Sequence, residues 1–232
     1  MAQNIFSTRL PNPDSGSDPE WREWDTFIGR EGIPTCDEEV VRCYQNLEER
    51  PHYLASNWLN HQLNLQNHGK GGAYATLAED QYGVDDDEEE YPANATTQAL
   101  ENVFSMKSCR FTADSVVFKG VHTEPFYEIH SFGSVEQDAV IEFPGFLSTS
   151  VCREKALDFA HRDGVLLVIQ GLDQVDCIVP QNSSIRTTKN AKVPEQEVLL
   201  RRGAKMCVER VVPKSTSGPR EVHLRIVGAL PN

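Results

Sequence analysis

The sequence predicts an α+β protein in which a helical amino-terminal part precedes a strand-rich carboxy-terminal part. Apolar residues recur at helical spacing up to about residue 107, whereas short β-branched runs dominate from about residue 111. The chain has 232 residues, 39% of them hydrophobic, which is enough for a sizeable core. We expect one domain over residues 35–232, divided into a helical part (35–110) and a β-rich part (111–232), preceded by a leader (1–34).

The leader contains four prolines together with Ser, Gly and Asp residues, which is typical of a flexible segment. Within it, Trp21, Trp24, Phe27 and Ile28 recur at helical spacing, so we expect a short helix that docks on the body of the protein. The first ten residues lack a basic head followed by an apolar run, so we expect no cleaved signal peptide.

Three helical stretches are expected before residue 111, the last over about 95–107. Their apolar positions are Val40, Val41, Tyr44 and Leu47; then Leu54, Trp58, Leu59 and Leu63; then Leu100, Val103, Phe104 and Met106. Between the second and third lies the acidic run Asp85–Glu90, which we interpret as a solvated loop because like charges repel and the ligand spacing of a calcium loop is absent.

Strands dominate the remainder of the chain, with one amphipathic helix over about 152–161. The predicted strands cover residues 115–119, 127–132, 138–143, 165–170, 176–180, 197–200, 205–212 and 221–228.

Charge and composition narrow the functional classes. Residues 1–110 carry 8 Lys and Arg against 20 Asp and Glu, whereas residues 111–232 carry 14 against 15. An acidic chain is a poor binder of nucleic-acid phosphates, so we expect no nucleic-acid partner. No apolar stretch approaches the length of a membrane helix, and we expect no membrane partner. The six cysteines form no CxxC pair, so we expect reduced thiols and no metal site.

Two short motifs can carry binding chemistry. Lys119 and Gly120 end an apolar strand, where a basic side chain can face a phosphate and a glycine lets a ligand approach closely. The run Ser148-Thr149-Ser150 ends another strand and supplies three small hydroxyl groups. Each motif also has an explanation without a ligand. A basic residue at the end of a strand is common, and Ser150 can cap the helix that follows.

The third motif is a pair of carboxylates, Glu195 and Glu197, at the entry to an apolar strand. If the strand is already extended there, both side chains lie on one face. Paired carboxylates raise at least one pKa when partly buried, which suits a site that needs an anion and a proton acceptor. Two solvated charges on an edge strand are the alternative.

In this order, the three motifs resemble those of arginine-directed mono-ADP-ribosyltransferases of the cholera-toxin type, including type III effectors of plant-pathogenic bacteria. The resemblance covers about residues 111–212. It implies a helical part followed by a core of two small sheets with NAD bound between them, NAD as substrate and no metal. It also implies a monomeric enzyme that is secreted into a host cell and modifies an arginine of a host protein; without secretion, the chain would be cytoplasmic.

The resemblance also implies a role for each motif residue. Glu197 would stabilise the positive charge that develops on the ribose, and Ser148 would orient Glu197. Thr149 and Ser150 would support the nicotinamide ribose pocket. Glu195 would orient the acceptor arginine and draw off its proton, with residues 187–194 as the recognition turn. The resemblance does not extend to the leader, 1–34, which we expect to be either a secretion and translocation region or a strand that packs over the cleft.

One departure leaves an alternative open. The family has arginine where this chain has Lys119, and lysine lacks the two-pronged hold of arginine on phosphate. Either Arg110 or Arg186 compensates, or the chain is a binding module that no longer loads NAD normally. A third class is a cysteine hydrolase that uses Cys152 or Cys109 with His122, His130 or His161, although no neighbouring residue marks either cysteine as a nucleophile.

Overall fold

The computed structural model describes residues 8–11, 24–45, 56, 59–60, 62–63, 93–121, 135–181, 196–215 and 218–229. The helices are α1 (Trp24–Glu31), α2 (Glu39–Tyr44), α5 (Ala93–Lys107) and α7 (Arg153–Ala160), with a short 3-10 turn at Leu172–Gln174. The strands are β1 (Thr35–Cys36), β2 (Val117–Val121), β3 (Val140–Phe143), β4 (Leu147–Ser150), β5 (Val165–Gln170), β6 (Cys177–Pro180), β7 (Glu197–Leu200), β8 (Ala204–Val212) and β9 (Arg220–Ala229).

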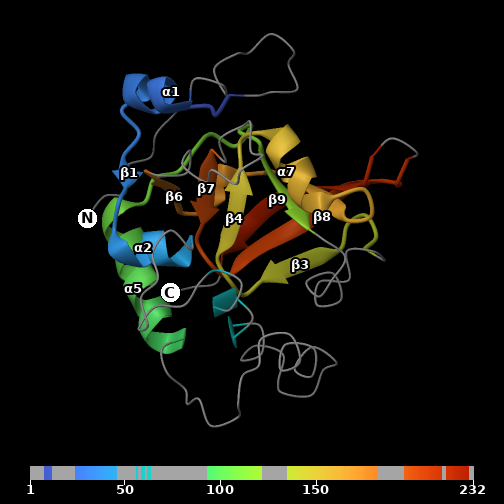
Figure 1. The fold of residues 1–232 in the computed structure, drawn as a ribbon. Helices are drawn as coiled ribbons and strands as arrows, with labels where there is room; N and C mark the ends of the chain where they lie inside the picture. Colours follow the sequence, from blue (N-terminus) through green and yellow to red (C-terminus); the bar gives the residue numbers. More distant parts are fainter. Residues whose placement is uncertain are drawn as a thin grey trace.

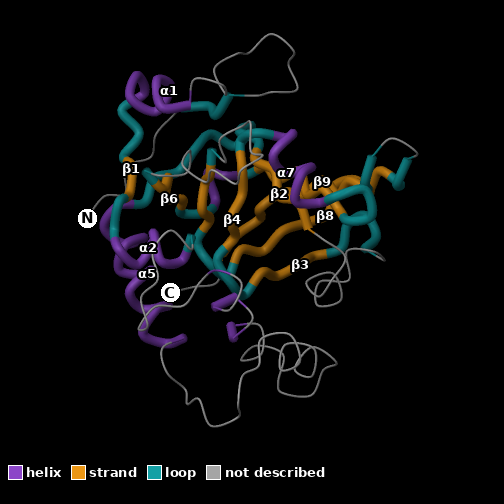
Figure 2. The backbone as a smooth tube through the Cα atoms, in the orientation of Figure 1, coloured by secondary structure: helices purple, strands orange, loops and turns teal. Residues whose placement is uncertain are grey.

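The strands form one mixed sheet in the order β1-β6-β7-β4-β2-β5-β9-β8-β3 (Figures 1 and 2). The pairs β1–β6 and β5–β9 are parallel and the others antiparallel. The implied division into two separate sheets is not confirmed, because the strand order is continuous. The link between β4 and β2 is nonetheless slight, since these strands pair only at Phe118 and Ser150.

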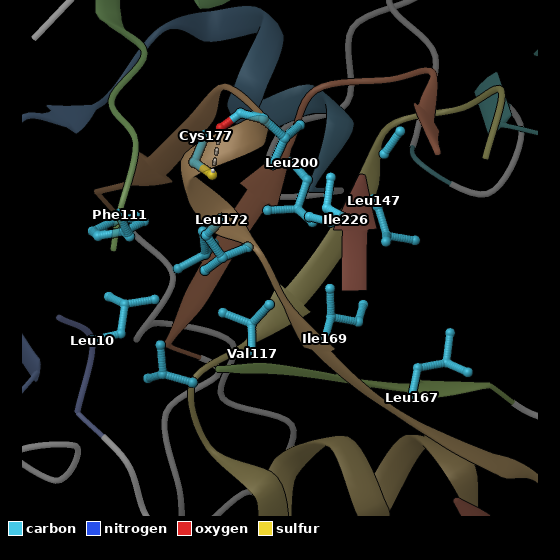
Figure 3. Close-up of a cluster of buried hydrophobic side chains, with 14 of the residues drawn as sticks. Leu10, Phe111, Val117, Leu147, Leu167, Ile169, Leu172, Cys177, Leu200 and Ile226 are labelled. Carbon is cyan, nitrogen blue, oxygen red and sulfur yellow. Dashed lines mark hydrogen bonds between the residues drawn. The ribbon is translucent and has the colours of Figure 1, made fainter. Parts of the chain in front are cut away.

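Strand alternation separates two apolar clusters on either side of β7. Val198 and Leu200 belong to the large central cluster, whereas Leu199 packs with α2 and α5 in a second cluster. Figure 3 shows the central cluster, in which side chains from β2, β4, β5, β7 and β9 gather. Because successive side chains point to opposite faces of a strand, Glu197 shares the face of Leu199 and is directed toward α2.

The second cluster fixes the two helices nearest to β7. It includes Val41 and Tyr44 of α2 and Leu100 and Phe104 of α5, all at most 1% exposed. The helix predicted over 95–107 is confirmed, and the one predicted at Val40, Val41, Tyr44 and Leu47 is confirmed as far as Tyr44. A wholly helical amino-terminal part is not confirmed, since residues 35–36 form a strand and residues 64–92 lie outside the described residues.

Most strand predictions agree with the structure within a few residues, because local apolar runs determine them. The predicted strand 127–132 lies outside the described residues, as do Trp21, Leu47, Leu54, Trp58 and the acidic run 85–90. The short helix expected in the leader corresponds to α1, whose Trp24, Phe27 and Ile28 side chains are buried in the central cluster. Among the described residues, no helix is both long and apolar enough to cross a membrane.

Candidate active site

Glu197 is a buried carboxylate at the start of β7, with 5% of its surface exposed. The preceding residue, Gln196, has a φ of 47°, in the left-handed region that non-glycine residues rarely adopt. The carbonyl oxygen of Gln196 accepts a hydrogen bond from the amide of Val151 at 3.1 Å. The chain therefore turns sharply and is tied to the end of β4 immediately before the carboxylate.

This turn removes the basis for placing Glu195 and Glu197 on one face of an extended strand. That argument requires extended backbone at Gln196, and the left-handed conformation there breaks the alternation. Glu195 itself lies outside the described residues, so its position stays a prediction.

The hydrogen bond to the Glu197 carboxylate comes from α2 rather than from the neighbouring strand. The side-chain amide nitrogen of Gln45, which is 6% exposed and follows the last residue of α2, donates to Oε2 of Glu197. In the described part of the chain, the structure shows no second hydrogen-bond donor to this carboxylate. Among the described residues no hydrogen bond joins the Ser148 hydroxyl to Glu197, so the orienting role of Ser148 stays a prediction.

The three hydroxyl residues of β4 differ in their surroundings. Ser150 lies directly opposite Glu197 in the β4–β7 pairing, and Ser148 lies opposite Leu199. Thr149 points the other way, and its hydroxyl donates to the carbonyl oxygen of Val198 at 2.5 Å.

The Ser150 hydroxyl does not cap α7 as an N-cap residue would. It accepts a hydrogen bond from the amide of Cys152 at 2.9 Å, and Cys152 itself occupies the N-cap position. Ser150 therefore closes a tight turn that leads β4 into the helix.

Lys119 brings a positive charge to the junction of β2 and β4. Its ammonium group donates to the carbonyl oxygen of Ser148 at 3.1 Å, although the two backbones pair at only one position. Burial lowers the pKa of the Lys119 ammonium to about 8, and the negative charge of Glu197 opposes this shift. The three motif residues Lys119, Ser148 and Glu197 therefore lie on the three adjacent strands β2, β4 and β7.

Gly120 has a packing role that the sequence did not indicate. A Cβ atom at this position would lie 1.9 Å from the carbonyl oxygen of Ala156 and 2.4 Å from the amide nitrogen of Ala160. The backbone of α7 thus occupies the space that we had expected a ligand to use.

Arg110 does not compensate for lysine at position 119. Its guanidinium binds Asp176, with Nε 2.8 Å from Oδ1, and donates to the carbonyl oxygen of Asp173 at 3.2 Å. These contacts lie beside the start of β6 and involve none of the motif residues. Arg186, the other candidate, lies outside the described residues.

The structure disfavours a cysteine nucleophile. Cys109 and Cys152 are at most 2% exposed, and burial raises the pKa of both thiols, that of Cys109 to about 12. Thiolate formation is therefore unfavourable at neutral pH. His161 is exposed, and His122 and His130 lie outside the described residues.

Sequence reasoning missed the contribution of the segment that follows α2. Tyr44 was expected as an apolar helix position, yet its hydroxyl donates to the carbonyl oxygen of Phe146 at 3.3 Å and accepts from Asn60 at 3.0 Å. Burial and the nearby charge of Glu197 raise the pKa of Tyr44. The residues Tyr44, Gln45 and Asn60 carry no motif, so the sequence offered no signal for them.

The described residues include no group of three or more His, Cys, Asp or Glu side chains that could hold a metal ion. What they do bring together is a buried carboxylate, small hydroxyl groups and one cation, within three neighbouring strands. A carboxylate held in this way can stabilise a developing positive charge, and the cation can attract an anionic group.

Solved structures of other proteins have a similar fold. The C3 exoenzyme of Clostridium limosum has a similar fold, at 15% identity with a TM-score of 0.53, covering 94% of this chain and 96% of that one. Also similar is an ADP-ribosyltransferase of Clostridium botulinum, at 13% identity with a TM-score of 0.52, covering 97% of this chain and 99% of that one. The ADP-ribosyltransferase Vis in complex with agmatine is similar at 14% identity with a TM-score of 0.52, covering 90% of this chain and 84% of that one.

No curated protein matches the sequence. The family model described as ADP-ribosyltransferase exoenzyme matches residues 98–228, which is more than half of the chain and includes β2, β4 and β7. The protein therefore belongs to the ADP-ribosyltransferase exoenzyme family.

Proposed function

We propose that the protein is a mono-ADP-ribosyltransferase that moves ADP-ribose from NAD to an arginine side chain of a host protein and releases nicotinamide. NAD is the substrate of its family. The observation that carries the proposal is the buried carboxylate of Glu197 on β7, beside the hydroxyl groups of β4, with only β4 between β7 and the strand of Lys119.

The residues present fit NAD in charge and in hydrogen-bonding capacity. The Oε2 atom of Glu197 accepts from Gln45, and among the described residues no donor contacts Oε1, which leaves that oxygen available to a ribose hydroxyl. Lys119 supplies a cation for the pyrophosphate. NAD contributes the bond between nicotinamide and ribose, whose cleavage leaves positive charge on the ribose.

Glu197 would accelerate this cleavage through electrostatics. A fixed anion stabilises positive charge more in the transition state than in the ground state, where that charge is spread over the nicotinamide ring. Loss of one such contact costs about 3–4 kcal/mol of transition-state stabilisation. The burial of Glu197 supports this role, because a water-poor site strengthens electrostatic interactions.

The hydroxyl residues would shape the pocket for the nicotinamide ribose. We assign Ser148 and Ser150 to the face that Glu197 shares, because they alternate with Thr149 along β4. Thr149 would support the site from beneath through its bond to Val198. Gly120 would contribute indirectly, by allowing α7 to approach β2 beside Lys119.

The choice of arginine as acceptor rests on Glu195. A guanidinium group is protonated in water and is a poor nucleophile. A carboxylate at position 195 would orient it and accept one proton, while a guanidinium nitrogen forms a bond to the ribose carbon that nicotinamide leaves. Residues 187–194 would form the surface that recognises the acceptor.

The acceptor protein and the site of action are further parts of the proposal. The family description, exoenzyme, suits a monomeric enzyme that is delivered into a host cell and modifies a protein there. The leader would serve that delivery or pack over the active site. In the described part of the leader, Leu10 and Trp24 are buried in the central cluster, on the face of β7 opposite to Glu197, so packing over the active site would fall to other leader residues.

The direct test is transfer of labelled ADP-ribose from NAD to agmatine, a small guanidinium compound, and to host-cell extract. We expect transfer to both, loss of transfer in Glu197→Ala, and loss of acceptor modification but retained NAD hydrolysis in Glu195→Gln. Transfer that survives Glu197→Ala would exclude the proposed chemistry. Modification of acceptors other than arginine, with agmatine inert, would exclude only the acceptor assignment.

A second candidate function is a binding module that has the transferase fold but does not load NAD normally. The observation that favours it is the Lys119 ammonium, which already donates to the Ser148 carbonyl and has its pKa lowered to about 8. Calorimetry with NAD separates the two functions. No binding at millimolar NAD, with binding restored by Lys119→Arg, would support the module; binding by the unaltered protein would support the enzyme.

A further inference from the structure

We propose that Gln45 is a positioning residue that holds the Glu197 carboxylate in its active orientation. This inference rests on the proposed function, in which Glu197 stabilises the ribose cation. It starts from the buried hydrogen bond between the two side chains, which come from positions 152 residues apart in the sequence.

The chemical type of the donor is important. A Lys or Arg side chain at this position would pair with Glu197 and neutralise the charge that the reaction needs. The amide of Gln45 is neutral, so it fixes one carboxylate oxygen while the negative charge is retained. It also leaves the other oxygen, Oε1, facing no donor among the described residues.

The side-chain amide of Gln45 is itself held in place, by a backbone hydrogen bond of the same residue and by burial. Gln45 is the C-cap of α2, and its backbone amide donates to the carbonyl oxygen of Val41 at 3.0 Å. Only 6% of Gln45 is exposed, so its side chain has little freedom to rotate away. The Gln45 side chain is therefore confined at the position where it meets Glu197.

The end of α2 is also fixed to β4, the strand of the hydroxyl motif. The Asn60 side chain donates to the carbonyl oxygen of Phe146 and accepts from the backbone amide of Phe146, both at 3.0 Å. It thus satisfies both backbone groups of Phe146, which is what a paired strand does in a sheet. The rings of Tyr44 and Phe146 meet edge to face, with centroids 6.0 Å apart. Because Phe146 directly precedes β4, these contacts connect Gln45 to the strand that pairs with Glu197.

Two other titratable groups interact with Glu197, the ammonium group of Lys119 on β2 and the hydroxyl of Tyr44 on α2. Burial lowers the pKa of the first and raises that of the second, so neither titrates in the acidic range. A change in the acidic limb of activity therefore does not arise from Lys119 or Tyr44.

The test uses three variants of the full chain. Gln45→Met keeps the length of the side chain and removes its donors, and Gln45→Glu places a second carboxylate against Glu197. Gln98→Met is the matched control, because Gln98 is exposed on α5 and, among the described residues, its side chain bonds to Asn102 on the same helix and to no other. The steady-state constants of NAD hydrolysis are measured between about pH 5 and pH 9, and thermal unfolding shows that each variant is folded.

For Gln45→Met we expect kcat to fall about ten- to a hundredfold, with the KM for NAD changed less than about threefold. The acidic limb of kcat should move to higher pH, since the ionised carboxylate loses the bond that favours it. For Gln45→Glu the limb should move further, because two adjacent carboxylates share a proton. Gln98→Met should match the unaltered protein.

A fall in kcat without movement of the acidic limb would overturn the inference, because general loosening of the fold lowers activity at every pH. So would unchanged kinetics in both Gln45 variants. If NAD is hydrolysed but agmatine is not modified, only the acceptor assignment fails and the Gln45 comparison still holds. If the unaltered protein does not turn over NAD, the proposed function fails, and the inference about Gln45 is then tested by carbon NMR. The carboxyl signal of Glu197 is identified because it disappears in Glu197→Gln. If the pKa of this carboxyl is the same in Gln45→Met as in the unaltered protein, the inference is overturned.

Discussion

The Lys119 ammonium lies 3.1 Å from the Ser148 carbonyl oxygen, across the two strands that join the halves of the sheet at a single residue pair. A lysine side chain therefore bridges backbones that are paired at only one position. This contact makes the cation part of the sheet junction as well as a candidate ligand for phosphate.

The affinity for NAD should depend on pH through Lys119. With its pKa lowered to about 8, the ammonium loses its proton as the pH rises through that value, and the attraction for pyrophosphate is lost with it. Calorimetry should show weaker NAD binding at about pH 9 than at about pH 7. Lys119→Arg should remove this dependence because guanidinium stays protonated, and Lys119→Met should bind about tenfold more weakly at the lower pH.

Equal pH dependence in the unaltered protein and in Lys119→Arg would contradict this prediction. The titrating group would then lie elsewhere on the protein.

Replacement of Gly120 by alanine should destabilise the protein, because the new methyl group would overlap the backbone of α7 at 1.9 Å. We expect the free energy of unfolding to fall by about 3 kcal/mol, at the upper end for overpacking, since backbone atoms cannot rotate away. Urea unfolding measures the difference. Gly228→Ala is the matched control on β9, where a Cβ atom meets nothing within 4 Å, and it should change stability by less than about 0.5 kcal/mol.

The guanidinium of Arg201 should be a major contributor to stability. It binds Glu101 of α5 and also Asp176, with Nη1 3.1 Å from Oδ2, and these side chains are 15%, 17% and 6% exposed. Arg201→Met would remove this partner from two largely buried carboxylates, although Asp176 keeps Arg110 and Glu101 keeps Arg202, and should lower the free energy of unfolding by about 2 kcal/mol.

The neighbouring Arg202 serves as the comparison, because it binds the same Glu101 with a side chain that is 42% exposed. Arg202→Met should cost less than about 1 kcal/mol in urea unfolding. Similar losses for the two arginines would show that burial does not determine the strength of these ion pairs.

The buried thiols should resist alkylation in the folded protein. Cys109 and Cys177 are at most 2% exposed, and burial raises the pKa of both. Cys207 is partly exposed and should react first with iodoacetamide. Mass spectrometry of peptides from briefly treated native protein tests this order, and early modification of Cys109 would indicate that the core opens at that point.

The sequence predicted those features of the fold that depend on neighbouring residues. The runs Val165–Gln170 and Cys177–Pro180 are strands because their side chains are apolar over lengths typical of buried strands. The motif residues Lys119, Ser148 and Glu197 were identified from residue type, order and family resemblance, and the structure places them on adjacent strands.

Features that depend on contacts between distant segments were not predictable in this way. The bond from Gln45 to Glu197 has no local signature, because a glutamine after a helix is ordinary until its partner is known. The two-residue strand Thr35–Cys36 exists only through parallel pairing with β6. The turn at Gln196 was missed because glutamine is not a residue type that favours positive φ.

The conformation of Gln196 also limits which residues evolution can sample beside the carboxylate. Glycine, asparagine and aspartate adopt a φ near 47° at low energetic cost, whereas valine, isoleucine and threonine are strongly disfavoured there. In a saturation library selected for retained folding, the β-branched residues should be depleted at this codon. The amino acids tolerated at position 196 are therefore restricted by backbone geometry, independently of any contact with substrate.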